Sequence, residues 1–164
     1  MKVEDVKEHI REYIINEESP FEVKKEDLNL EGNYSYNKMI RNKITKGDYG
    51  VYLWSDTKTG EILYVGMSGK FKKDKDRQTI IQNHTVGKRL VSSRGRKKNE
   101  YGKLKDISTS DFIRNKVMID GVKSITISVF YTEKRKYSPT YIESIILQNI
   151  FNKSNSLPKF NKSF

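Results

Sequence analysis

The clearest pattern in the chain is an alternation of apolar and polar residues over residues 123–131, with the sequence KSITISVFY. Such a period of two predicts a half-buried β-strand. Two shorter runs, over residues 50–55 and 61–66, are rich in aromatic and β-branched residues and flank the polar turn Thr57–Gly60. They predict a β-hairpin. Three strands are therefore expected.

Apolar residues at helical spacing predict a helix over residues 3–16, which Pro20 would end. A last helix is expected over residues 139–152, with Pro139 in its first turn. Between them we expect a helix over residues 84–94 and a short one over 109–116. Polar or basic stretches predict irregular structure at residues 21–48, 67–82 and 94–99, and the tail 157–161 is expected to be extended.

The order helix, hairpin, helix, strand, helix predicts an α+β fold, with a small mixed or antiparallel three-stranded sheet flanked by helices. A chain of 164 residues is long enough for one ordinary core. Residues 48–164 hold the predicted sheet and form the main domain. Residues 1–47 are interpreted as an N-terminal helical extension of it.

Composition narrows the classes of function. The chain has no cysteine and two histidines, which excludes disulfides and cysteine-ligated zinc and disfavours a multi-histidine metal site. Its apolar runs are far shorter than the roughly 20 residues that span a bilayer, and the first residues lack the apolar region of a signal peptide. We expect a cytoplasmic protein that does not enter a membrane.

The net charge of +11 is unevenly distributed. Residues 1–32 hold ten acidic and five basic residues, whereas residues 70–105 hold thirteen basic and three acidic ones. Clustered like charges repel each other, and this favours a polyanion-binding face over a merely solvated surface. No basic amphipathic helix accompanies the charge, so a membrane surface is a weaker candidate.

Two tyrosines stand out in the predicted hairpin. A turn centred on Lys58 would place Tyr52 opposite Tyr64, with Trp54 and Ile62 on the same face. Paired aromatic residues commonly stabilise a sheet, so the hairpin alone favours a packing role for both phenols.

Glu143 is the strongest candidate for chemistry. It shares one face of the last predicted helix with Ile146, Leu147 and Ile150, the face expected to meet the sheet. A carboxylate there is costly unless it is paired or binds a metal. An ion pair with a buried arginine, an acidic first turn stabilised by the helix dipole and a metal site all remain open.

A third group of candidates lies at the start of the helix predicted over residues 84–94. The planar guanidinium of Arg89 can clamp a phosphate oxygen, and Lys88 adds charge beside it. His84 can donate a proton to a leaving oxygen or orient water. The plain alternative is that these are surface charges and a structural histidine.

Together these residues resemble the GIY-YIG nuclease family, named after two short motifs on adjacent strands. Here the motifs read Gly50-Val51-Tyr52 and Tyr64-Val65-Gly66. Arg89 matches the arginine that family members carry on the next helix, Glu143 matches their metal-binding glutamate, and Pro158–Asn161 matches a closing Pro-x-x-Asn element. The resemblance covers roughly residues 48–161.

The chain also departs from the family pattern. Members often carry His or Tyr one helical turn after the arginine, where this sequence has Ser93, and His84 is the candidate to replace it. The stretch 67–82 and the spacing from Glu143 to Asn161 both exceed the compact family pattern.

The resemblance implies a phosphodiester hydrolase that uses one Mg²⁺ or Mn²⁺. Glu143 would hold the ion together with a phosphate oxygen, Tyr52 or Tyr64 would activate water, and Arg89 would offset charge in the transition state. The motif glycines would let the chain turn tightly beside the phosphate.

The implied substrate is double-stranded DNA, cut by a restriction-type or phage DNA-degrading endonuclease. A palindromic target would imply a homodimer or sequential nicking. Base readout would fall to Arg94, Arg96, Lys97, Asn99 and the segment 34–41. RNA remains open as a substrate, and a non-catalytic nucleic-acid-binding module is the competing class. The residues expected to contact DNA are Lys70, Lys88, Arg94, Arg96, Lys97, Lys98 and Asn161.

Overall fold

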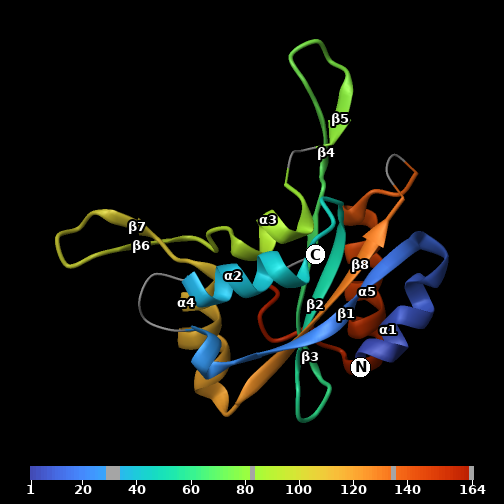
Figure 1. The fold of residues 1–164 in the computed structure, drawn as a ribbon. Coiled ribbons are helices and arrows are strands. Elements are labelled where there is room, and N and C mark those ends of the chain that lie inside the picture. Colours follow the sequence, from blue (N-terminus) through green and yellow to red (C-terminus); the bar gives the residue numbers. More distant parts are fainter. Residues whose placement is uncertain (29–33, 82–83, 134–135, 163–164) are drawn as a thin grey trace.

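The centre of the molecule is one four-stranded antiparallel sheet, with strand order β1-β8-β2-β3 (Figure 1). The strands are β1 (Ile14–Lys24), β2 (Gly50–Asp56), β3 (Ile62–Ser68) and β8 (Ser124–Thr132). The computed structural model describes residues 1–28, 34–81, 84–133 and 136–162. The expected α+β class, with an antiparallel sheet flanked by helices, is confirmed.

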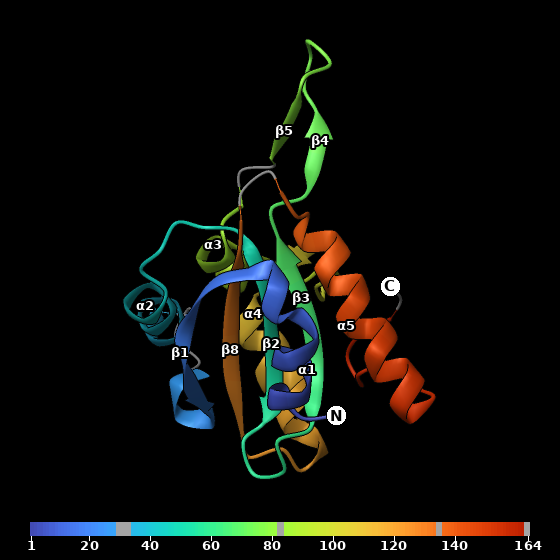
Figure 2. The same ribbon diagram turned by 90° about the vertical axis from the view of Figure 1, so that its right-hand side faces the viewer.

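Helices cover both faces of the sheet (Figure 2). One face packs against α1 (Val3–Ile10) and α5 (Pro139–Ser154). The other face packs against α2 (Tyr34–Lys43), α3 (Val86–Val91) and the turn after α4 (Thr109–Phe112). That turn is a π-helical stretch, Ile113–Val117, followed by a 3₁₀ turn at Met118–Asp120; further 3₁₀ turns lie at Arg11–Tyr13 and Lys25–Leu28.

The first predicted helix is correct for residues 3–10 and wrong from Ile14 onward, where the chain enters β1. Pro20 lies within this strand. It is tolerated because β1 is at the edge of the sheet and its register with β8 shifts between Glu18 and Phe21. This edge strand is the fourth strand, which the sequence pattern did not predict.

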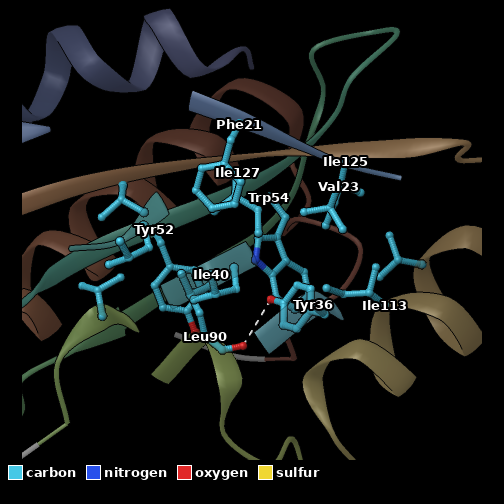
Figure 3. Close-up of a cluster of buried hydrophobic side chains, with 14 of the residues drawn as sticks. Phe21, Val23, Tyr36, Ile40, Tyr52, Trp54, Leu90, Ile113, Ile125 and Ile127 are labelled. Atoms are coloured by element: carbon cyan, nitrogen blue, oxygen red, sulfur yellow. Dashed lines mark hydrogen bonds between the residues drawn. The ribbon is translucent and has the colours of Figure 1, made fainter. Parts of the chain in front are cut away.

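The N-terminal residues are built into the core rather than appended to it. Phe21 and Val23 of β1 and Tyr36 and Ile40 of α2 are buried in the same cluster as Tyr52 (Figure 3). These four belong to the part predicted as an extension or as irregular structure. Residues 29–33 of that stretch lie outside the described residues.

The β2–β3 hairpin differs from its predicted register. Asp56 bonds to Glu61 across the turn, and a bulge follows between Trp54 and Ser55. Tyr64 therefore faces Trp54 and not Tyr52. Tyr52, Trp54 and Tyr64 still share one face, as expected, whereas Ile62 is displaced to the other.

Two further hairpins begin in the stretches 67–82 and 94–99, which were predicted to be loops, and both project from the body (Figure 1). The first joins β4 (Phe71–Lys73) and β5 (Thr79–Ile81), and the second joins β6 (Arg96–Lys98) and β7 (Leu104–Asp106). Residue 82 of the first predicted loop lies outside the described residues. No helix in the described ranges is long and apolar enough to cross a membrane.

Candidate active site at the edge of the sheet

Both motif tyrosines bind one guanidinium. Arg94 donates from Nη2 to the hydroxyl oxygen of Tyr52, 2.9 Å away, and from Nη1 to that of Tyr64, 3.0 Å away. Its Nε donates to Thr109 Oγ1 at 3.2 Å. The guanidinium also lies over the ring of Trp54, 4.9 Å from the centroid. A planar fork with several fixed donors is suited to holding two oxygens at once.

Arg94 was expected on an exposed basic loop, in contact with DNA, but its side chain points into the protein. Its backbone N–H donates to the carbonyl of Ile107 at 2.8 Å, which fixes the residue at the base of the β6–β7 hairpin. Burial opposes the charge on Arg94, but Tyr52 and Tyr64 outweigh it and raise the pKa of the guanidinium. The side chain therefore stays cationic beside the two phenols.

The motif glycines provide space within the sheet rather than a turn. A Cβ on Gly66 would lie 2.5 Å from Cζ of Tyr52 and 2.8 Å from Cε1 of Tyr64. A Cβ on Gly50 would lie 2.0 Å from the carbonyl oxygen of Phe130 on the neighbouring strand. Gly66 thus permits the two phenols to converge, which corrects the expected role beside a phosphate.

Tyr64 keeps its proton at neutral pH. Burial, and to a smaller extent Tyr52, raise its pKa to about 12, although Arg94 and Arg89 act in the opposite direction. Because the Tyr64 oxygen accepts a hydrogen bond from Arg94, its own O–H is left to donate elsewhere. The side chain is poised to donate a hydrogen bond, and use as a base would require additional positive charge nearby.

Glu143 lies on α5, the helix that packs on the face of the sheet opposite to Tyr52 and Tyr64. Burial raises the pKa of its half-buried carboxyl to about 7, and Arg89 lowers it in part. The same carboxylate contributes to the raised pKa of Tyr64. Among the described residues Glu143 has no ion-pair partner, so the buried-arginine alternative is not what the structure shows.

An open pocket of about 200 Å³ lies at the end of β3. Three of the expected site residues line it: Lys70, His84 and Arg89. The hydroxyl of Ser68 donates to the carbonyl of His84 and joins the strand to the start of α3. The pocket therefore presents cationic and polar side chains at the strand end.

The remaining expected DNA contacts divide into two groups. Lys88 on α3 and Arg96, Lys97 and Lys98 on β6 are exposed. Asn161 is engaged with the backbone of Val65: its Oδ1 accepts from the N–H and its Nδ2 donates to the carbonyl, both at 2.8 Å. This pair satisfies the free edge of β3, a structural role in place of the expected DNA contact.

Two of the residues expected to contact DNA bases form hydrogen bonds within the protein. Asn99 Oδ1 accepts from the N–H groups of Tyr101 and Lys103 in the β6–β7 turn. In the segment 34–41, Tyr36 is buried and donates to the carbonyl of Leu90 on α3 at 3.2 Å, which fixes the helix that carries Arg89 (Figure 3).

The site fits one hard cation with few protein ligands. The described residues contain no group of three or more histidine, aspartate or glutamate side chains able to hold an ion. Glu143 is a half-buried carboxylate without an ion-pair partner in the described chain, and the charge of Arg89, which lines the pocket, acts on it. Mg²⁺ and Mn²⁺ accept one carboxylate with water and substrate oxygens as the other ligands.

Compared with known proteins, the chain matches no family model, no curated protein and no solved structure. Arg94 was placed wrongly from the sequence because nothing in the run RGRKKN distinguishes an inward arginine from its exposed neighbours.

Proposed function

We propose that this protein is a metal-dependent DNA endonuclease of the GIY-YIG type, which hydrolyses phosphodiester bonds. The observation that carries the proposal is the convergence of the Tyr52 and Tyr64 hydroxyls on Arg94, with the carboxylate of Glu143 close enough to act on the pKa of Tyr64. Two phenols, a carboxylate and a cationic pocket form a set of groups that can bind a phosphate and move a proton.

The pocket would receive the scissile phosphate. Arg89 and Lys70 would neutralise its charge and stabilise the additional charge of the transition state. Tyr64, which is only partly buried, would orient the attacking water through its hydroxyl, whereas the fully buried Tyr52 would help to position Tyr64 through their shared hydrogen bonds to Arg94. His84, exposed at the mouth of the pocket, is placed to protonate a leaving oxygen.

Glu143 would hold the divalent ion. When bound, Mg²⁺ or Mn²⁺ supplies positive charge that polarises the phosphate and favours loss of a proton from nearby hydroxyls. The raised pKa of Glu143 is consistent with this role, because a cation would recover the free energy that burial of the carboxylate costs.

The substrate would be double-stranded DNA, and the biological role that of a restriction-type or phage DNA-degrading enzyme acting in the cytoplasm. Two basic hairpins that project from the body, β4–β5 and β6–β7, support a duplex substrate (Figure 1). The same hairpins favour the second candidate, a nucleic-acid-binding module without catalysis, in which the tyrosines and Glu143 only pack.

Metal-dependent cleavage separates the two candidates. Supercoiled plasmid would be incubated with the protein in Mg²⁺, Mn²⁺ or EDTA, alongside Glu143→Gln and the control Glu61→Gln, whose side chain is exposed in the β2–β3 turn. We expect metal-dependent nicking or cutting that Glu143→Gln abolishes and Glu61→Gln retains. If the plasmid stayed intact in every lane while the protein still shifted DNA in a gel, the result would favour the binding module without catalysis.

A further inference from the structure

The β6–β7 hairpin with its connecting turn, residues 95–107, forms an arm that leaves the body of the protein (Figure 1). Every residue of its two strands is exposed, so neither face packs on the core. A two-stranded hairpin with no core of its own is marginally stable in water. A surface of this kind is suited to a partner that covers it.

The base of the arm is fixed to the candidate active site. The ladder continues from β6–β7 through two hydrogen bonds of 2.8 Å, from Arg94 N–H to the Ile107 carbonyl and from Ile107 N–H to the Gly95 carbonyl. Arg94 is the residue that binds both tyrosine hydroxyls. Whatever the arm binds is therefore held in a fixed relation to the site.

Cations lie on both faces of the arm. The register pairs Lys97 with Lys105, which places both on one face, while Arg96 and Lys98 lie on the other. A DNA groove presents a phosphate strand on either side, and the major groove is wide enough for a two-stranded ribbon. The charge pattern matches a hairpin that lies in a groove better than one that rests flat on a surface.

The tip of the arm carries an exposed aromatic ring. Asn99 Oδ1 accepts from the N–H groups of Tyr101 at 3.1 Å and Lys103 at 2.8 Å, and this turn presents the Tyr101 side chain outward. Tyr101 is 78% exposed, and Leu104 beside the turn is 64% exposed. Lys98 and Lys103 lie within three residues of this ring in the sequence, and an exposed aromatic ring with basic residues nearby is a combination that stacks on nucleobases.

We propose that the β6–β7 arm lies in a groove of duplex DNA and that Tyr101 stacks on a base there. The choice of DNA rests on the function proposed above. Strands rise about 3.3 Å per residue, so the five residues from Arg94 to Asn99 carry the tip roughly 17 Å from the site, about five base pairs of duplex. Tyr101 would contact the target beyond the cleaved phosphate.

The test measures binding without metal, so that it is independent of cleavage. Fluorescence anisotropy with a labelled duplex would compare the wild type with Tyr101→Ala, Tyr101→Phe and the control Tyr141→Ala, a tyrosine on α5 that is 53% exposed. We expect Tyr101→Ala to weaken binding by between about 5-fold and about 150-fold, the range for stacking on one single-stranded base, and toward the lower end because separating base pairs in a duplex offsets part of that gain. Tyr101→Phe and Tyr141→Ala should bind as the wild type does.

A second variant places a reporter at the tip. In Tyr101→Trp the new indole is exposed, whereas Trp54, the only natural tryptophan, is fully buried and gives a constant background. We expect the fluorescence of the new indole to be quenched on binding to duplex DNA. Unquenched emission, or wild-type affinity in Tyr101→Ala, would overturn the proposal.

Two outcomes distinguish this proposal from the proposed function. Cleavage of DNA with full affinity in Tyr101→Ala would overturn the arm and keep the endonuclease. Binding that depends on Tyr101 without any cleavage would keep the arm and overturn the endonuclease. If Tyr101→Ala instead converted a dimer to a monomer with DNA affinity intact, the arm would be a contact between copies of the chain, and the proposal would be wrong.

Discussion

Gly66 lies directly against the ring of Tyr52, on the adjacent strand. The two residues face each other in the β2–β3 register, and a Cβ on Gly66 would lie 2.6 Å from the Tyr52 hydroxyl oxygen. The second motif therefore ends in glycine because the phenol of the first motif occupies the space of a side chain. The two motifs form one packed unit.

Gly66→Ala should displace Tyr52 from Arg94. Tyr52 is fully buried and cannot swing away, so overpacking should cost about 1–3 kcal/mol of unfolding free energy. Urea unfolding would measure the loss of stability, and a cleavage assay would measure the effect of displacing Tyr52 on activity. Gly47→Ala is the matched control, because a Cβ there meets nothing within 4 Å and should be nearly neutral. Equal behaviour of the two variants would contradict the packing argument.

Arg94→Lys should keep the positive charge at this position but lose most of the proposed cleavage activity. One ammonium cannot reproduce the planar fork that binds Tyr52 and Tyr64 together, so the phenols should lose their relative position. We expect the single-turnover cleavage rate to fall about 100-fold, the scale of an ångström misplacement in a site. Arg96→Lys, in an exposed pair with Asp106, should change little. A wild-type cleavage rate in Arg94→Lys would show that the guanidinium is not required for the proposed reaction.

Glu143→Gln should stabilise the protein in alkaline but not in acidic solution. The folded-state pKa of about 7 exceeds the ordinary value of 4.5, so the folded carboxyl binds its proton more tightly than the unfolded one. The wild type then loses stability as the pH rises from about 4.5 to 7, by on the order of 2 kcal/mol. Thermal unfolding at pH 4 and pH 8 would show the variant gaining only at pH 8.

The wild type and Glu143→Gln together also test whether a metal ion binds at Glu143. Mg²⁺ or Mn²⁺ that binds the folded state at Glu143 should raise the melting temperature of the wild type at pH 8, and should leave Glu143→Gln unchanged. An equal shift in both proteins would mean that the ion binds elsewhere or through general screening.

Asn161→Ala should reduce stability and leave DNA affinity intact. The variant loses both carboxamide bonds to Val65 and leaves the edge of β3 unsatisfied, at a cost of about 1–3 kcal/mol. Denaturant unfolding and gel shifts would measure the two properties separately. A loss of DNA affinity with unchanged stability would restore the expected contact between Asn161 and DNA.

The local pattern of apolar and polar residues was sufficient to predict much of the fold. The strands at residues 50–55, 61–66 and 123–131 alternate or are densely aromatic, and the structure has a strand at each. Pro139 opens α5 as predicted, because its fixed φ suits the first turn of a helix. Strand β1 escaped prediction because its sequence IINEESPFEVK has no sustained period and contains a proline that only an edge strand accommodates.

The sequence by itself determined the charge asymmetry, the two tyrosine motifs and a glutamate on an apolar helix face, because each is a property of neighbouring residues. Only the tertiary structure decided which groups meet. Arg94 reaches Tyr52 from 42 residues away, and Asn161 binds Val65 from 96 residues away. Contacts between residues so distant in the chain depend on how the sheet and the hairpin base are packed, and no local periodicity encodes that packing.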